Sequence, residues 1–170
     1  DLNCLLYMLE TSLVGYFGLL GKAEKQAHYL NAAETRKAAI QNLFWNEEAG
    51  FYIDYSWRNR EQTKPYTLAG VLPLFARIAK TNQAERVKDK LMDSFLEQGG
   101  LATSLSERGE AWDSPNAHAA LQWFAVVGLT HYGFVDEAKD IATRWLTMVR
   151  HQFGMTRTLF DSYNAISLSQ

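Results

Sequence analysis

The chain has 170 residues, of which 47% are hydrophobic and 21% charged, with a formal net charge of −2. This composition is typical of one globular domain, or of part of a larger one, and the absence of a basic excess argues against nucleic acid and anionic membranes as partners. A lone cysteine, Cys4, rules out an internal disulfide.

The first forty residues predict two helices. Apolar side chains recur at three- and four-residue steps from Leu2 to Leu20, with Asp1 as N-cap and Gly21 as the stop. No uncharged apolar run reaches 18 residues, so we expect no membrane span. A second helix is predicted from about Lys22 to Phe44, with an apolar inner face and a charged outer face.

The middle of the chain predicts an extended interruption followed by two helices. Residues 50–57 alternate and are rich in aromatics, which predicts a short β-hairpin or extended loop. A third helix is expected from Pro65 to Ala79, with a kink or break at Pro73. Asn82 and Glu85 match a capping box for a fourth helix that ends near residue 95.

The last third predicts a long polar loop and two more helices. Ser114 and Pro115 are expected to start a fifth helix, which is apolar on nearly every side and therefore predicted to be deeply buried. Gly133 should end it, and a sixth, amphipathic helix is expected over residues 135–153. The fold class is thus all-α, with six helices in three antiparallel hairpins.

The junction before the fifth helix carries the residues typical of a sugar site. An indole face, such as that of Trp112, stacks on the C–H face of a pyranose, and the carboxylate of Asp113 accepts hydrogen bonds from hydroxyl groups. The alternative is structural: Asp113 or Ser114 caps the helix and Trp112 packs in the loop.

Four stretches resemble the trehalase family, in the family's order. They are Asp1-Leu-Asn-Cys-Leu-Leu-Tyr-Met-Leu-Glu10, Leu43-Phe-Trp-Asn46 with Gly50-Phe-Tyr-Ile-Asp-Tyr55, Gly99-Gly-Leu-Ala-Thr-Ser104, and Trp112-Asp113-Ser-Pro-Asn116 running on to Leu121-Gln-Trp123. The resemblance covers essentially the whole chain. It implies an (α/α)6 toroid, of which residues 1–170 would form about half as a single partial domain.

The second trehalase signature is altered around Trp112 and Asp113. Ala111 stands where the family has Gln, Ala117 replaces Gly, His118 replaces Trp and Ala120 replaces Pro. By resemblance, Trp112, Asp113, Asn116 and His118 are the candidate substrate-binding residues. For His118 the alternative is a polar residue that is merely satisfied within the fold.

Glycoside hydrolysis needs two carboxyl groups, one as acid and one as base or nucleophile. In the family the base is the Glu of a Leu-Val-Glu-Lys-Tyr-Asp run, and here Leu159-Phe-Asp-Ser-Tyr-Asn164 matches it, which makes Asp161 the candidate base. The alternative is an exposed tail residue. The family's acid lies in a Ser-Gly-Trp-Asp-Phe-Ser segment that these 170 residues do not contain, so we expect the chain alone to be inactive.

Three functions remain open. The first is a segment of an inverting trehalase that converts α,α-trehalose to glucose. The second is a related α-toroid glycosidase acting on another glucoside, suggested by Ala111 and His118. The third is an inactive carbohydrate-binding or assembly half-barrel.

No metal or cofactor is predicted, because the four histidines lack metal-ligand spacing and no phosphate-binding glycine loop occurs. The expected ligand is a small carbohydrate, a disaccharide.

An assembly is also expected. Half a toroid leaves apolar helix faces uncovered, and large exposed apolar patches are rare in monomers. We therefore expect self-association or packing against further chain.

Overall fold

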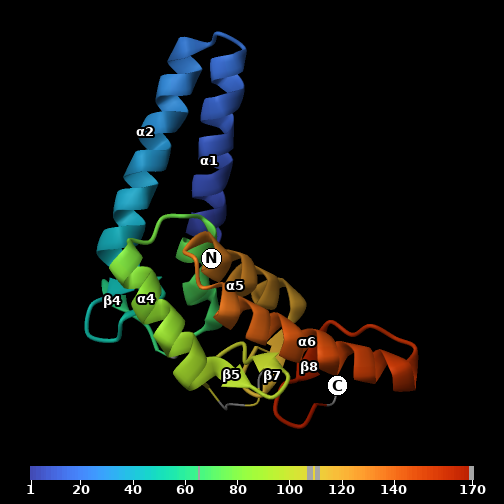
Figure 1. The fold of residues 1–170 in the computed structure, drawn as a ribbon. Coiled ribbons are helices and arrows are strands. Elements are labelled where there is room, and N and C mark those ends of the chain that lie inside the picture. The colour runs from blue at the N-terminus through green and yellow to red at the C-terminus, as the bar shows by residue number, and fades with distance from the viewer. Residues whose placement is uncertain (65, 107–108, 110–111, 169–170) are drawn as a thin grey trace.

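The computed structural model describes residues 1–64, 66–106, 109 and 112–168. Helices dominate it, as predicted (Figure 1). The α-helices are α1 (Leu2–Leu19), α2 (Ala23–Ala39), α3 (Leu72–Phe75), α4 (Thr81–Lys90), α5 (Ala119–His131) and α6 (Val135–Thr156). A 3-10 turn occupies Leu68–Val71, and π-helical turns extend α2 over Ile40–Phe44 and α4 over Leu91–Phe95.

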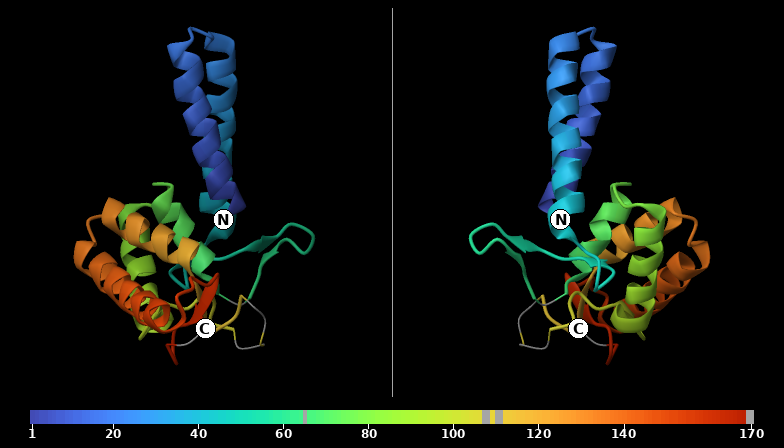
Figure 2. Two further views of the ribbon diagram at one scale, coloured as in Figure 1. Left: turned by 90° about the vertical axis from the view of Figure 1, so that its right-hand side faces the viewer. Right: turned by 90° about the vertical axis from the view of Figure 1, so that its left-hand side faces the viewer.

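The strands are short and pair two by two, all antiparallel. β1 (Trp45–Asn46) pairs with β2 (Phe51–Tyr52), β3 (Tyr55–Ser56) with β4 (Glu61–Gln62), β5 (Leu96–Glu97) with β6 (Gly100–Leu101), and β7 (Asn116–His118) with β8 (Ser162–Asn164). The extended segment predicted near 50–57 is therefore shared between two successive hairpins. The second of these, β3–β4, extends away from the helices (Figure 2).

Helices α1 and α2 form an antiparallel arm that projects from the rest of the molecule (Figures 1 and 2). Asp1 caps α1 as predicted, and the chain turns at Gly21, whose φ of +64° suits glycine. The two helices are joined by Arg36, whose guanidinium donates to both carboxylate oxygens of Glu10 at 2.7 and 2.9 Å and to Asn3. A bidentate pair of this kind fixes the register of the arm.

The apolar face of the arm is largely open. Leu2, Leu5, Leu9 and Tyr16 are between 43% and 62% exposed. Among the described helices, α1 alone is long and apolar enough to meet the requirements of a membrane-crossing helix, which buried core helices and signal sequences also meet. The apolar face of α1 that the sequence predicts to point inward is thus largely uncovered by the other described residues.

A helix–turn–hairpin unit occurs twice in the fold. In each copy a helix ends in a π-turn and leads directly into a hairpin whose strands have two residues each, first as α2–β1–β2 and then as α4–β5–β6. Equivalent hydrogen bonds close both units: Ile53 N–H donates to Phe44 C=O at 2.8 Å, and Ala102 N–H to Phe95 C=O at 2.9 Å. Each unit delivers the loop after its hairpin to the same end of the helices.

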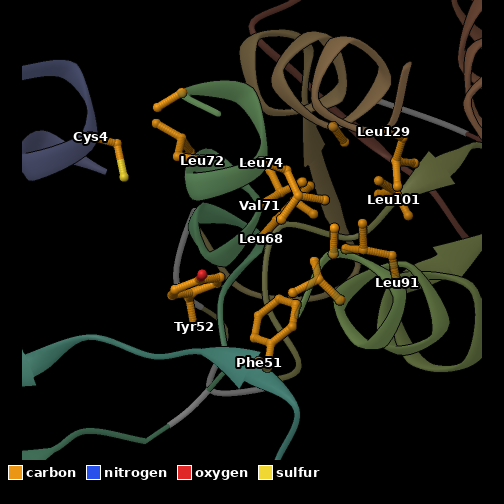
Figure 3. Packing of buried hydrophobic residues seen from close by; sticks show 14 of the residues in the cluster. Cys4, Phe51, Tyr52, Leu68, Val71, Leu72, Leu74, Leu91, Leu101 and Leu129 are labelled. Carbon is orange, nitrogen blue, oxygen red and sulfur yellow. The ribbon is translucent and has the colours of Figure 1, made fainter. Parts of the chain in front are cut away.

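The core lies where these two units meet the 3-10 turn and α5 (Figure 3). Phe51 is fully buried and stacks on Phe95 with ring centroids 5.5 Å apart. Gly70 makes this packing possible, since a Cβ there would lie 2.3 Å from the Phe51 ring and 2.5 Å from the carbonyl oxygen of Tyr52.

Two helix predictions need correction in the middle of the chain. The long helix expected over 65–79 is wrong: a 3-10 turn is followed by the single turn α3, which holds Pro73 in its first turn, where proline is tolerated, and ends at Phe75. Pro65 lies outside the described residues. The predicted Asn82–Glu85 capping box is also wrong, because Gln83 Oε1 accepts the Lys80 N–H at 2.9 Å, which starts α4 at Thr81.

The fifth helix was predicted to start at Ser114 and Pro115, but α5 begins at Ala119. The intervening residues Asn116–His118 are taken into β7 by pairing with β8. The predicted burial on all sides is also wrong within the chain: Gln122, Ala125, Gly128 and Leu129 are buried, whereas Trp123 is 62% exposed. Its second apolar side thus has no cover from the described residues.

Gln122 ties α5 to the second hairpin by acting as a backbone partner. Its Oε1 accepts the Leu101 N–H at 2.9 Å, and its Nε2 donates to the Leu101 C=O at 2.6 Å, all in a buried setting. Replacing it with leucine would leave both Leu101 groups buried without partners.

We expect Gln122→Leu to lower the free energy of unfolding by roughly 2–5 kcal/mol, from two unsatisfied backbone groups. Urea unfolding followed by circular dichroism measures this, with exposed Gln98→Leu as the matched control. A loss below about 1 kcal/mol would show that Leu101 finds other partners.

Candidate active site

The pairing of β7 with β8 brings the two candidate signatures together. Ala117 lies opposite Tyr163 and His118 opposite Ser162, although more than forty residues of chain separate them. The Tyr163 hydroxyl accepts the Phe160 N–H at 3.0 Å, and its ring packs edge-on against Trp145. This buried tyrosine fixes the turn that carries Asp161 beside the loop that carries Trp112.

An open hollow of about 570 Å³ lies at this junction. A hollow of this size is within the range of small-molecule sites. It is lined by Asp1, Asp54, Thr67, Ala69, Thr103, Trp112, His118, Ala119, Ala120, Leu121 and Asp161. The structure therefore brings Trp112, His118 and Asp161 to one surface, at the end of the helices where the connecting loops meet.

Trp112 and His118 form a flat wall of this hollow. Their rings are stacked with centroids 4.1 Å apart and an interplanar angle of 15°. His118 is 6% exposed, whereas Trp112 is 61% exposed and leaves most of its indole surface free to contact a ligand. An exposed aromatic face at the edge of a polar hollow suits the apolar face of a pyranose.

His118 is held in place by the protein as well as by the stack. Its Nδ1 lies 2.9 Å from the hydroxyl oxygen of buried Thr103. Burial lowers the pKa of His118 below the usual value for histidine, while the negative charge of Asp161 opposes that shift. Burial thus favours the neutral form of the ring.

Two of the predicted binding residues, Asp113 and Asn116, do not line the hollow. Asp113 is buried, and its carboxylate accepts from the Ser104 hydroxyl at 3.2 Å. Asn116 joins neighbouring segments through its backbone, donating to Asp113 C=O and accepting from Thr103 N–H. The helix-capping alternative stated for Asp113 and Ser114 is wrong, because α5 starts at Ala119 with His118 at its N-cap. Ala111 lies outside the described residues.

Several lining residues were not predicted as site residues. Asp1 and Asp54 bring two further carboxylates to the hollow, and Thr67 and Thr103 bring hydroxyl groups. Three of these residues could have been suspected from the sequence, because Asp1, Asp54 and Thr103 lie in the stretches that resemble the family. Within the described ranges, no group of three or more His, Cys, Asp or Glu side chains has a metal-binding arrangement.

Comparison with known proteins gives a consistent result. The trehalase family model matches residues 1–170. A periplasmic trehalase from Salmonella paratyphi B is 36% identical over 167 residues, which cover 98% of this chain and 29% of that protein. Neutral trehalase from Saccharomyces cerevisiae superposes with a TM-score of 0.87 at 26% identity, over 98% of this chain and 34% of that one.

A mannosylglycerate hydrolase from Thermus thermophilus shares the fold, with a TM-score of 0.84 at 20% identity over 98% of this chain and 40% of that one. The architecture is therefore that of the α/α-toroid glycosidases. The chain belongs to the trehalase family. It spans about a third or less of the length of the trehalases it matches.

Proposed function

We propose that this chain is a segment of a glycoside hydrolase that converts α,α-trehalose to glucose with inversion of configuration. The observation that carries this proposal is the convergence of Trp112, His118 and Asp161 on one hollow in a chain of the trehalase family. The choice of trehalose as substrate is supported by the relatives, since both the bacterial and the yeast proteins are trehalases.

In this proposal Asp161 is the general base. Its exposed carboxylate removes a proton from a water molecule, and the water oxygen attacks the anomeric carbon from the face opposite the leaving glucose. A second carboxyl group must protonate the glycosidic oxygen, and the family's acid segment does not occur among these 170 residues. Trp112 would stack on a glucose ring, and Asp1 and Asp54 would accept hydrogen bonds from its hydroxyl groups.

The second candidate is an α-toroid glycosidase acting on another glucoside. The observation in its favour is His118, which gives the hollow a polar ring where the family has an indole. Comparing kcat/KM for trehalose with that for other α-glucosides separates the two candidates. Trehalose binding without turnover by an otherwise complete protein would favour the third, a carbohydrate-binding half-barrel.

The role of Trp112 gives the first test of this proposal. In an active enzyme that contains this segment, we expect Trp112→Ala to raise KM for trehalose about tenfold, through loss of a stacking contact of roughly 1 kcal/mol or more. Trp57→Ala is the matched control, because Trp57 is 76% exposed on the β3–β4 hairpin and does not line the hollow. Equal KM values for Trp112→Ala and Trp57→Ala would show that Trp112 does not contact the substrate.

We further propose that residues 1–170 form one partial toroid domain whose open faces pack against more protein. The α1–α2 arm exposes its apolar face, and a second apolar groove between α5 and α6 is bordered by Trp123 and Leu146, which are 62% and 64% exposed. Faces of this kind are covered in stable proteins.

The isolated 170-residue chain is therefore expected to self-associate and to bind a hydrophobic dye. Light scattering gives the molecular mass, and dye fluorescence reports the open faces. A folded monomer at high concentration that binds no dye would contradict this expectation.

A further inference from the structure

His118 stands where the family has tryptophan. The imidazole ring of His118 is held by two specific contacts, which a side chain that only fills space would not need. One ring face is covered by Trp112 at a centroid distance of 4.1 Å, and Nδ1 is engaged by the Thr103 hydroxyl at 2.9 Å. The Thr103 side chain is itself 3% exposed, and its backbone is bonded on both sides, to Leu68 and Asn116. Position and rotation of the imidazole are both fixed.

The remaining ring nitrogen, Nε2, faces the hollow. It has no hydrogen-bond partner among the described residues. Every fully buried side-chain nitrogen or oxygen atom of these residues does have a partner, so Nε2 is not fully buried. Nε2 therefore reaches open space, and the space that His118 lines is the hollow that it shares with Asp161.

The charges around the hollow select one tautomer. The charged groups that face it are three carboxylates, of Asp1 at the start of α1, Asp54 in the β2–β3 loop and Asp161 before β8, and the α-amino group of Asp1, while Asp113 does not line the hollow. Negative charge on this side favours a hydrogen on Nε2. Nδ1 then accepts from the Thr103 hydroxyl, which is the arrangement that the 2.9 Å contact allows.

We propose that His118 is a positioning residue for the Asp161 carboxylate. Thr103 and Trp112 fix the ring, and the Nε2–H group donates to a water molecule in the hollow that in turn donates to Asp161. The inference rests on the proposed function of Asp161 as base. Asp161 is one methylene, about 1.5 Å, shorter than the family's glutamate, and an added donor on this side holds the shorter carboxylate and its water in place.

The 170-residue chain itself permits the test. With ¹⁵N-labelled histidine, we expect His118 to show a single Nε2–H tautomer at neutral pH, assigned by its loss in His118→Gln. Asp161→Asn should lower the pKa of His118, because it removes a negative charge, and should do so by more than Asp54→Asn. The exposed rings of His28, His131 and His151 serve as internal controls and should not respond.

A pKa of His118 that is unchanged in Asp161→Asn, or that falls equally in Asp54→Asn, would overturn the inference, as would a mixture of tautomers. These results do not depend on turnover, so they test the role of His118 separately from the proposed trehalose hydrolysis.

In an active enzyme that contains this segment, near-isosteric Thr103→Val should lower kcat about ten- to a hundredfold with little change in KM. Thr103→Ser should restore kcat, and its failure to do so would assign Thr103 a packing role alone.

Discussion

Asp161→Asn should reduce kcat for trehalose by about 10²–10⁴-fold in an active enzyme that contains this segment. Asparagine keeps the size of the side chain but cannot accept the proton from the attacking water. Glucose release measured over time gives kcat and KM separately. We expect KM to change little, because the base contributes mainly in the transition state.

Two variants control this experiment. Asp93→Asn removes an exposed carboxylate outside the hollow and should leave kcat unchanged. Asp161→Glu introduces the family's residue and should retain activity, since it supplies the same chemistry with a longer reach. Wild-type rates in Asp161→Asn would mean that another group is the base, with Asp1 and Asp54 as the other carboxylates at hand.

Phe51→Ala is expected to cost about 3–5 kcal/mol of unfolding free energy, which is a large part of the stability of a domain of this size. The ring is fully buried, is stacked on Phe95 and meets Tyr66 edge-on, so its removal opens a cavity where the two repeated units meet. Chemical denaturation monitored by circular dichroism measures the loss. A variant with no cooperative transition would agree with the expectation.

Trp57→Ala is the control for this core substitution, because it removes a larger aromatic side chain that is 76% exposed. It should change the unfolding free energy by no more than about 0.5 kcal/mol. Similar losses in Phe51→Ala and Trp57→Ala would show that the core has been placed wrongly.

Helices with a long uninterrupted period were predictable from the sequence. The apolar steps of α1, the two-faced pattern of α2 and the amphipathic pattern of α6 set these helices within a few residues of their observed bounds. Gly21 and Gly133 marked two turns correctly, and both have positive φ. Local pattern is sufficient here because the period of a helix is written in consecutive residues.

Local pattern failed where distant segments decide the structure. Residues Asn116–His118 resemble the first turn of a helix in sequence, but their pairing with Ser162–Asn164 holds them extended. No signal near residue 116 reports a partner more than forty residues away. The same reason explains α5, whose apolar residues indicated burial on all sides although only one side is covered by the described residues.

The site was predictable in part. Trp112, His118 and Asp161 were named from the sequence, and the structure places them on one hollow. Asp113 and Asn116 were named with them but do not line it. The Asp113 side chain is buried and accepts from Ser104, because a residue next to a binding residue in the chain can turn its side chain into the protein. Asp1 and Asp54 reach the hollow only through the meeting of α1 with the first hairpin, which no single stretch of sequence shows.

The central claim, inverting hydrolysis of α,α-trehalose with Asp161 as the base, is tested most directly by proton NMR of the newly released sugars. An active enzyme that contains this segment should release one α-glucose and one β-glucose from each trehalose before mutarotation, since only the attacked ring is inverted. The signals should be lost together in Asp161→Asn. Release of α-glucose alone, or an undiminished β-glucose signal in Asp161→Asn, would contradict the account.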